Sequence, residues 1–312
     1  MAPGCRYPLR MPTGFIAGID LGASNVRVVI ANHDGEVEAR RTFPLPPGSP
    51  EDVVFKIGRT VDELARGVWV GAKVDAIGIV LPGTVDPAAG VVASIANMPG
   101  WDRVELAKLI GTPRSVPVAM ENDANAAAIG EGWLGAAKGL RDFAFVALGT
   151  GIGAGLVLDG RLHRGAHFLA GEIGFAPMTP QQLLAGGIEH ALESAVGGRR
   201  IAAMAVDLLG THAKPSDLFD AAYAGEERAV AWLSELQKYL SMAAAQIIAL
   251  VDPQTIVFGG GVIHAQGERL LAPVRELAYR CTPTRTPIVV STLGDDAQVL
   301  GAVKVALDLV LA

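Results

Sequence analysis

The sequence predicts a two-domain α/β protein, and three observations support this fold class. The chain has 312 residues, which at about 150 residues per domain favours two domains. Half of the residues are apolar and 19% are charged, as in ordinary globular proteins. Strand-like runs alternate with longer segments of helical spacing, and a strand meander interrupted by glycines occurs twice.

The first half of the chain opens with the first meander. Phe15–Asp20 and Val26–Ala31 are apolar runs on either side of Gly22, and Asp34–Gly35 is a turn before Glu36–Thr42. Hydrophobic periodicity and helix-breaking residues predict the elements that follow. They are a helix at Glu51–Val70, a buried strand at Val74–Leu81, a strand at Val116–Met120, and a helix at Ala126–Leu134 with its N-cap within Glu121–Asn125.

The second half repeats the meander and is then mostly helical. Phe143–Leu148 leads through a glycine turn to Gly155–Leu158, and Asp159–Gly160 is the next turn. Helices are expected at Ile188–Val206, which Gly197–Gly198 interrupts, and at Ser216–Tyr223, Glu226–Val251, Glu268–Arg280 and Ala297–Val310, with strands at Thr255–Phe258 and Ile288–Thr292.

Charge and cysteine content exclude several function classes. The chain has 26 Lys and Arg against 32 Asp and Glu, a formal charge of -6, and we find no basic cluster in the sequence, so we expect no nucleic-acid partner. The two cysteines, Cys5 and Cys281, are too few for a disulfide framework, and we expect a cytoplasmic protein. The longest uncharged apolar run, Phe143–Leu158, is too short to span a membrane.

Three glycine-bearing turns each follow an apolar strand. They lie at Asp20–Asn25, Gly149–Gly155 and Gly259–Val262. Glycine lets backbone N–H groups converge closely on phosphate oxygens, and Ser24 and Thr150 add hydroxyl donors. A single turn of this kind is equally well explained as a tight hairpin, but three together favour phosphate binding.

The phosphate-binding hypothesis also implies a metal ion. None of the three turns has the spacing of a P-loop or of a Rossmann dinucleotide motif. A carboxylate beside phosphates repels them unless a cation lies between, so Asp20 indicates magnesium, reached through water. The alternative is that Asp20 only caps the turn.

The chain resembles the ROK sugar kinases, bacterial members of the actin, sugar kinase and Hsp70 superfamily. The resemblance runs from about Phe15 to the C-terminus, in nine segments in the family's order. They are Gly18–Ser24, Leu81–Asp86, Asn97–Trp101, Glu121–Ala126, Leu148–Gly155, Gly171–Gly174, Leu192–Glu193, Phe258–Val262 and Leu293–Ala297.

The resemblance implies a ribonuclease H-like, actin-like fold with an interdomain cleft that holds the sugar. The small domain would be residues 14–118 together with the final helix, 297–310, and the large domain residues 119–296. The loops at Asp20 and Gly149 would hold the phosphates of ATP, and the third loop would face adenosine. The residues implied in nucleotide binding are Asp20, Gly22, Ser24, Asn25, Gly149, Thr150, Gly151, Gly153, Gly259, Gly260 and Gly261.

Asp123 is the candidate general base. Phosphoryl transfer to a sugar hydroxyl needs an acceptor for the proton, placed in line with the γ-phosphate. A position at a helix start favours the ionised carboxylate, and the alternative is that Asp123 is only an N-cap. The resemblance assigns sugar contacts to Asn97, Asn122, Asp123, Glu172 and Glu193. Read without it, Asn97 is a turn residue and Glu193 a solvated side chain.

The sequence departs from the family at the zinc site. Many members have a histidine and three cysteines there, whereas this chain has Phe175 at the histidine position and Leu184, Gly186 and Ala191 at the cysteine positions. We therefore expect no structural zinc. The replaced histidine also touches sugar in the family, so Phe175 puts the choice of sugar in question. Asn25 replaces the usual Lys, and Ala23 and Ala154 stand at positions that are often glycine.

These residues predict an ATP- and magnesium-dependent hexose kinase, with glucose as the first candidate acceptor. One alternative is a kinase for another sugar, such as an amino sugar, fructose, mannose, allose or a glycoside, or one that uses polyphosphate. Others are a sugar-responsive regulator and an inactive sugar sensor; about 14 residues precede Phe15, fewer than a DNA-binding domain needs. The resemblance also makes a homodimer an expected form.

Overall fold

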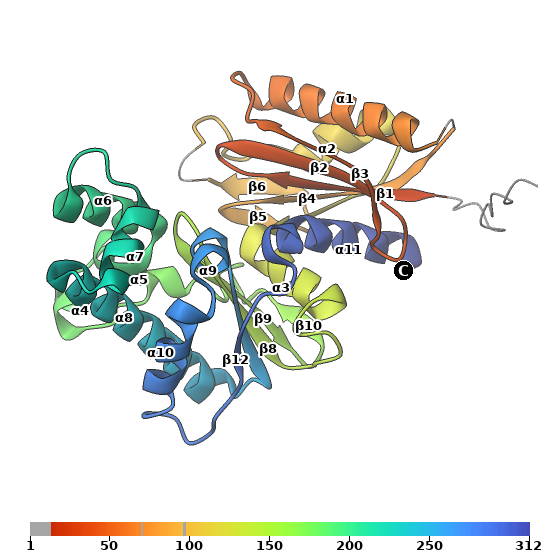
Figure 1. Ribbon diagram of the computed structural model, residues 1–312. Helices are drawn as coiled ribbons and strands as arrows, with labels where there is room; N and C mark the ends of the chain where they lie inside the picture. Colours follow the sequence, from red (N-terminus) through yellow and green to blue (C-terminus); the bar gives the residue numbers. More distant parts are fainter. Residues whose placement is uncertain (1–13, 70, 96–97) are drawn as a thin grey trace, which may run out of the picture. The chain divides into compact units, whose positions relative to one another are not determined.

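The structure is a computed structural model that describes residues 14–69, 71–95 and 98–312. It divides into two compact units (Figure 1). Unit 1 runs to Asp123 and takes in Ala302–Ala312, and unit 2 is Ala124–Gly301. Asp123 is therefore the last residue of its segment of unit 1, and helix α11 (Ala297–Leu311) contributes residues to both units.

Unit 1 contains a five-stranded sheet in the order β3-β2-β1-β4-β7. The hairpins β1–β2 and β2–β3 are antiparallel, whereas β4 pairs in parallel with both β1 and β7. A separate hairpin, β5–β6, was not predicted from the sequence, because its strands have only three and four residues. The strands are β1 (Phe15–Leu21), β2 (Asn25–Ala31), β3 (Val37–Pro44), β4 (Val74–Leu81), β5 (Thr84–Asp86), β6 (Val91–Ser94) and β7 (Val118–Asn122).

The helices α1 (Pro50–Val68) and α2 (Leu106–Gly111) pack on this sheet, and the 3-10 turn η1 (Thr112–Arg114) follows α2 directly. Helix α1 begins at a capping box in which Ser49 and Asp52 each accept a hydrogen bond from the backbone of the other. Its apolar stripe, which includes Ile57 and Val61, is buried with strand residues in one core. Helix α11 packs on β4 at Gly78, where a methyl group would overlap the Ala302 carbonyl oxygen.

Unit 2 repeats this topology with a five-stranded sheet in the order β10-β9-β8-β11-β12. The pairs β8–β9 and β9–β10 are antiparallel, and β11 pairs in parallel with β8 and β12. The repeated meander predicted from the sequence is thus present in both sheets. The strands are β8 (Phe143–Leu148), β9 (Ile152–Leu158), β10 (Arg161–His163), β11 (Thr255–Gly259) and β12 (Ile288–Val290).

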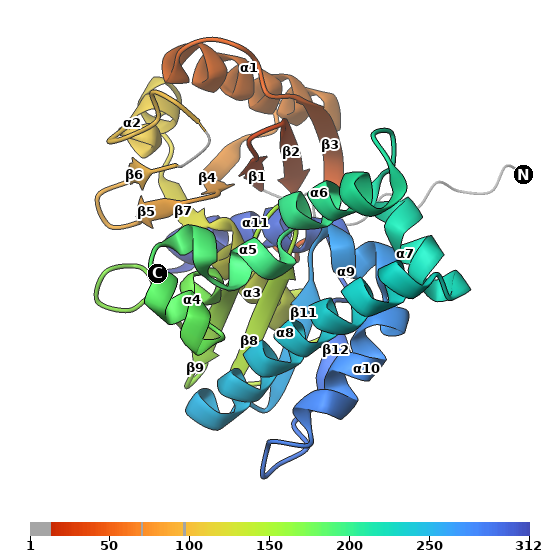
Figure 2. The same ribbon diagram turned by 90° about the vertical axis from the view of Figure 1, so that its left-hand side faces the viewer.

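Helices cover both faces of the second sheet. On one face, α8 and α10 lie across the strands (Figure 2) and share a core with β8 and β11. On the other face, residues of α3 and the start of α11 pack on Phe143 and Phe145. The helical elements are α3 (Asp123–Leu134), η2 (Ile173–Phe175), α4 (Pro180–Ala185), η3 (Ile188–His190), α5 (Leu192–Val196), α6 (Gly198–Leu209), α7 (Pro215–Ala224), α8 (Glu227–Val251), α9 (Gly261–Gln266), α10 (Glu268–Ala278) and η4 (Gly294–Asp296).

Two predicted helices differ from the structure. The predicted interruption of the helix at Ile188–Val206 is present at Gly197, whose extended backbone with ψ 151° separates α5 from α6; a second break that was not predicted lies at Ala191, with ψ -174°, and separates η3 from α5. Helix α3 begins at Asp123, three residues before the predicted start at Ala126, so Asp123 lies in its first turn and not ahead of it.

A buried carboxylate ties α3 to the loop that follows β12. Glu131 is fully buried and accepts hydrogen bonds from the Ser291 hydroxyl, from the Leu293 N–H at 3.2 Å and from the Ala136 N–H at 2.6 Å. Such bonds to a carboxylate are stronger than neutral ones. They fix the C-terminal part of α3 relative to the segment that leads into α11.

Candidate active site

In unit 1, three predicted site residues lie at the carboxyl ends of parallel strands. Asp20 is near the end of β1, and Asn122 and Asp123 stand where β7 passes into α3. The register pairs Asp20 with Val80 of β4 and Leu81 of β4 with Asn122. Asp20 and Asn122 are therefore two strand spacings apart, roughly 10 Å. Open α/β sheets bind ligands at this edge.

The turn after β1 is tight and exposed at its tip. The Gly22 N–H donates to the Asn25 carbonyl at 3.0 Å, and the Leu45 N–H donates to the Ser24 carbonyl at 2.8 Å. Ala23, Ser24 and Asn25 are exposed. The turn is thus anchored by its backbone while its side chains face solvent.

Asp20 is a partly buried carboxylate in a crowded charge environment. Its side chain is 23% exposed and lies 3.8 Å from the guanidinium of Arg27, its register partner on β2. Burial raises the pKa of Asp20 to about 6; Arg27 opposes this shift, and the negative charge of Asp123 adds to it. A divalent cation bound here would relieve the repulsion between Asp20 and Asp123, and carboxylate oxygens are ligands that magnesium prefers. The residues present therefore fit the ion.

Asn122 is held by the backbone around it. Its side-chain amide donates to the Gly83 carbonyl at 3.1 Å, and its N–H donates to the carboxylate of Glu121 at 3.0 Å. Glu121 is itself buried. These bonds fix the strand-to-helix junction that carries Asp123.

In unit 2, the second glycine loop joins β8 to β9. The Gly149 N–H donates to the Gly151 carbonyl at 3.0 Å, closing the turn. The carbonyls of Gly149 and Thr150 accept hydrogen bonds from the N–H groups of Gly198 and Arg199, at 2.9 and 3.2 Å. The start of α6 thus supports this loop, while Thr150 remains exposed. Gly153 follows in β9.

The third glycine loop lies beside the second. Strands β8 and β11 are parallel neighbours, with Ala147 opposite Gly259, so both loops leave the same edge of the sheet. Gly260 has φ 88°, and a methyl group there would contact the Leu148 carbonyl, so this position requires glycine. At Gly149 and Gly261, by contrast, no described atom lies within 4 Å of the place a Cβ would take.

Glu193 extends from α5 over the second loop. Its carboxylate accepts a hydrogen bond from the Ile152 N–H at 3.2 Å, and a methyl group at Gly151 would overlap it. Glu193, Thr150 and Phe175 line one cavity of about 210 Å³ together with Glu189, Ser194, Gly197, Arg199 and Arg200. Glu172 occupies the N-cap position of η2, three residues before Phe175, whose side chain is 47% exposed.

A family model described as the ROK family matches residues 16–309. The chain belongs to the ROK family. It is 31% identical over 315 residues to a glucokinase of Thermotoga maritima, covering 95% of this chain and 98% of that protein. These likenesses identify a sugar kinase with the actin-like ATPase and sugar kinase fold.

Two solved structures of ROK kinases resemble this one along nearly their whole length. The ROK hexokinase of Thermus thermophilus has a TM-score of 0.83 and 29% identity, with 96% of this chain and 100% of that chain covered. The ROK family glucokinase of Streptomyces griseus, in complex with glucose and AMPPNP, has a TM-score of 0.77 and 27% identity, covering 94% and 99%.

The segment that replaces the zinc motif of this ROK kinase is described from Phe175 to Ala191. It forms α4 and η3, with Leu184 at 86% exposure and Gly186 ending α4. In the described part of the chain, no group of three or more His, Cys, Asp or Glu side chains could hold a metal ion. None of the described helices is both long and apolar enough to cross a membrane. Asn97, a predicted sugar contact, lies outside the described residues.

Sequence reasoning missed two relationships in this site. It did not single out Arg27, although pairing β1 and β2 across the turn after Leu21 would have placed Arg27 opposite Asp20. It also took Glu193 only as a sugar ligand or a solvated side chain, whereas its carboxylate bonds to the backbone of the glycine loop. No local pattern signals that contact, since 41 residues separate the partners.

Proposed function

We propose that this ROK kinase transfers the γ-phosphate of ATP to a hydroxyl of a hexose, with glucose as the first acceptor to test. One observation carries the proposal. In each unit the predicted site residues gather at the carboxyl edge of parallel strands, with Asp20 and Asn122 in unit 1 and the two glycine loops in unit 2. The relative bound to glucose and AMPPNP supports both substrates.

The glycine loops would bind the nucleotide. Gly149 and Gly261 have open space where a side chain would begin, so a phosphate or ribose can approach the backbone there. The resemblance assigns phosphates to the loop of Gly149, Thr150, Gly151 and Gly153, and adenosine to Gly259–Gly261. In unit 1, the resemblance assigns Gly22, Ser24 and Asn25 to nucleotide binding.

Asp123 would act as the general base. The acceptor oxygen attacks the γ-phosphorus, the bond from that phosphorus to the bridging oxygen breaks, and ADP leaves with the electron pair. The hydroxyl proton passes to the carboxylate of Asp123. The position of Asp123 in the first turn of α3, secured by Asn122 and Glu121, supports this role.

Asp20 would hold magnesium through water. Bound there, the ion would neutralise phosphate charge as it develops. The chain's own residues contribute the carboxylate of Asp20, which would accept hydrogen bonds from water on the ion, and a nearby cation at Arg27, 3.8 Å away. Because Asn25 stands where the family usually has Lys, Arg27 is the basic group that this loop offers.

Asn122, Glu172 and Glu193, with Asn97, would bind sugar hydroxyls. Amides and carboxylates that a bound sugar covers discriminate strongly among sugars, since a missing hydroxyl leaves a covered polar group unpaired. Phe175 lines the cavity beside Glu193 and presents an apolar wall where the family has a histidine. Because of this wall, other sugars, glycosides and amino sugars are alternative acceptors. Polyphosphate is an alternative donor.

The cellular location and the macromolecular partners are also part of the proposal. We propose that the protein acts in the cytoplasm, binds no nucleic acid and forms a homodimer. Its formal charge of -6 supports the absence of a nucleic-acid partner.

A sugar and donor panel tests the proposal. Purified protein is assayed for ADP release and sugar phosphate with glucose, fructose, mannose, allose, N-acetylated sugars and methyl glucoside, each with ATP and with polyphosphate. We expect the highest kcat/KM for glucose with ATP, and no turnover without magnesium. Absence of turnover on every hexose would overturn the kinase assignment, and a tenfold preference for another sugar would overturn glucose.

A further inference from the structure

The carboxylate of Glu193 is bonded to the second glycine loop, a contact that the proposed chemistry does not use. Its Oε2 accepts the hydrogen bond from the Ile152 N–H at 3.2 Å, and a methyl group at Gly151 would overlap the same oxygen. Glycine at position 151 therefore allows the carboxylate to lie directly against the loop. The other oxygen, Oε1, forms no hydrogen bond with any residue that the structure describes, so it remains for a ligand.

The Ile152 N–H belongs to an open edge of β9. Strand β10 pairs with β9 only from Leu156 onward, so no described strand covers that side of β9 before Leu156. N–H groups of alternate residues point to the same side of a strand. On this side the Ala154 N–H donates to the Gly171 carbonyl at 2.8 Å, and the Ile152 N–H donates to Glu193. Ile152 is buried, and a buried N–H without an acceptor destabilises the conformation that buries it.

The residues that follow Glu193 hold the same loop through their backbone. The Gly197 N–H donates to the Glu193 carbonyl at 2.8 Å, where α5 ends and α6 begins. The next two N–H groups along the chain donate to the carbonyls of Gly149 and Thr150, at 2.9 and 3.2 Å. The loop is thus held at its start by two backbone hydrogen bonds and at its end by the Glu193 side chain.

Of these three bonds to the loop, only the one to Ile152 depends on a side chain. A phosphate-binding loop must keep its backbone groups in one arrangement, since a misplacement of about 1 Å costs about 10²-fold in rate. We propose that Glu193 is a positioning residue for the second glycine loop. Its Oε2 keeps the loop in the conformation that accepts the phosphates of ATP, while Oε1 is left for the acceptor sugar. The inference rests on the proposed function in one respect, namely that this loop binds the nucleotide.

A role in sugar binding alone makes a different prediction. A residue that only contacts sugar changes the KM for sugar and leaves nucleotide binding unchanged when no sugar is present. A positioning residue changes the affinity for nucleotide before any sugar binds. The affinity of the sugar-free protein for AMPPNP, a non-hydrolysable analogue of ATP, therefore separates the two roles of Glu193.

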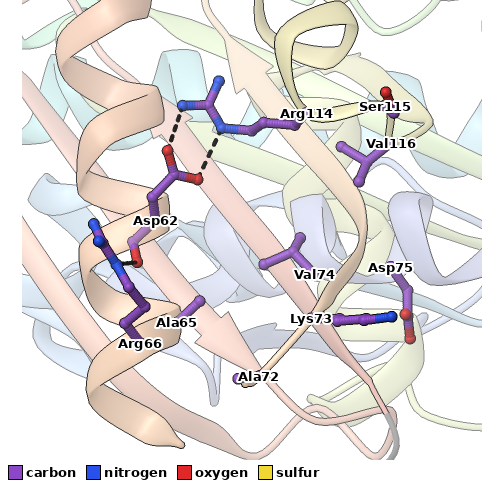
Figure 3. A pocket seen from close by; sticks show the side chains of 10 residues that line it. All are labelled: Asp62, Ala65, Arg66, Ala72, Lys73, Val74, Asp75, Arg114, Ser115 and Val116. Carbon is purple, nitrogen blue, oxygen red and sulfur yellow. Dashed lines mark hydrogen bonds and ion pairs between the residues drawn. The ribbon is translucent and has the colours of Figure 1, made fainter. Parts of the chain in front are cut away.

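The cavity of unit 1 does not offer a competing phosphate site. It has a volume of about 600 Å³ and is lined by α1, the segment that leads into β4 and the segment after η1. Arg114 donates from Nε and Nη2 to the two carboxylate oxygens of Asp62, at 3.0 and 2.8 Å. Figure 3 shows the Lys73 side chain directed toward Asp75. The cations of this cavity do not converge on one point, so we expect AMPPNP binding to report on the glycine loops.

Paired variants isolate the hydrogen bond from the charge. Glu193→Ala and Glu193→Gln are both uncharged, but only the Gln side chain has a carbonyl that accepts the Ile152 N–H. Glu193→Asp keeps the charge, is one methylene shorter and should resemble Glu193→Ala. The matched control is Glu189, a carboxylate of the same cavity whose side chain forms no hydrogen bond with a described residue. Thermal unfolding checks that each variant folds.

Hydrogen exchange of single amides reads out the loop without nucleotide or sugar. Mass spectrometry with electron-transfer fragmentation resolves the Ile152 amide from its neighbours. We expect this amide to exchange about tenfold faster in Glu193→Ala than in Glu193→Gln, which should exchange as the parent does. The Ala154 amide, held by the Gly171 carbonyl, should exchange equally in all variants and serves as the internal control.

Calorimetric titration with AMPPNP, without sugar, reads out nucleotide binding. We expect the Kd of Glu193→Ala to be about tenfold higher than that of Glu193→Gln, and the KM for ATP to rise in parallel. Glu189→Ala and Glu189→Gln should not differ from each other in either measurement. If Glu193→Ala does not fold, Glu193→Asp takes its place in both comparisons.

Three results would overturn the proposal. Equal exchange of the Ile152 amide in Glu193→Ala and Glu193→Gln would show that the bond does not hold the loop. Equal AMPPNP affinity of the two variants, with only the KM for sugar changed, would show that Glu193 serves the sugar alone. Failure of the proposed function is a distinct result, because the parent protein itself then binds no AMPPNP, and the positioning role is excluded with it.

Discussion

Asp20 and Arg27 face each other across the β1–β2 hairpin, with carboxylate and guanidinium 3.8 Å apart. The pair does not cancel the cost of burial, since burial raises the pKa of Asp20 to about 6 even with Arg27 beside it. The folded protein therefore holds an energetically unfavourable carboxylate at neutral pH, as expected for a group whose partner is a bound cation.

This arrangement makes Asp20 a source of pH-dependent stability. Between its ordinary pKa of 3.8 and about 6, the folded protein retains a proton that the unfolded chain has released, so the free energy of unfolding falls as pH rises through that window. Asp20→Asn should raise stability at pH 7.5 by at most about 3 kcal/mol, and by less at pH 4.5, in urea titrations without magnesium.

The control for Asp20 is an exposed aspartate. Asp159 has a left-handed backbone and an 89% exposed side chain, so Asp159→Asn should leave stability unchanged at both pH values. An equal gain for Asp20→Asn at pH 4.5 and pH 7.5 would contradict the raised pKa.

Magnesium should compete with the proton on Asp20. Turnover is expected to decline as pH falls through about 6 at limiting magnesium, because protonated Asp20 loses the negative charge that would hold the hydrated ion. Raising the magnesium concentration should move the midpoint to lower pH. The test is a series of pH–rate profiles at fixed ATP; a midpoint that ignores magnesium would show that Asp20 does not hold it.

Removal of the proposed base should abolish most turnover. Asp123→Asn keeps the size of the side chain and loses the proton acceptor, so kcat should fall about 10²- to 10⁴-fold with little change in melting temperature. Asp159→Asn, the same chemical change at a distant exposed site, should keep full activity. Turnover of Asp123→Asn at the parental rate, with the fold intact, would be fatal to the mechanism.

A methyl group added at Gly149 tests whether the backbone of the second glycine loop contacts the phosphates of ATP. The backbone of Gly149 does not have a positive φ, and no described atom lies within 4 Å of the place a Cβ would take. Gly149→Ala should therefore fold normally. If phosphate approaches this backbone, the methyl should raise the KM for ATP by about tenfold, or about 1.4 kcal/mol. Gly67→Ala, at another open position, is the matched control; equal KM values for both variants would exclude contact at Gly149.

The packing of α3 against α11 should tolerate no side chain at Gly301. A methyl group there would overlap the Ala126 carbonyl oxygen, so Gly301→Ala should lower the free energy of unfolding by about 1–3 kcal/mol. In α1, Gly67→Ala meets no neighbour and should stabilise by up to about 1 kcal/mol through helix propensity. Guanidinium titrations measure both; a neutral Gly301→Ala would mean that the two helices can separate.

Local sequence patterns predicted much of the fold and part of the candidate site. Turn residues and periodicity predicted the meander of each unit, and the structure contains both, because a strand–turn–strand unit is determined by neighbouring residues. Short elements such as β5, β6 and α4 escaped prediction, since too few residues carry a period.

The sequence by itself determined which residues could perform the chemistry, and where along the chain each glycine loop follows a strand. Only the tertiary structure decided which groups meet: Arg27 opposite Asp20, and Glu193 over Ile152. The physical reason is that these contacts depend on strand register and on packing between segments distant in sequence, neither of which a local pattern encodes.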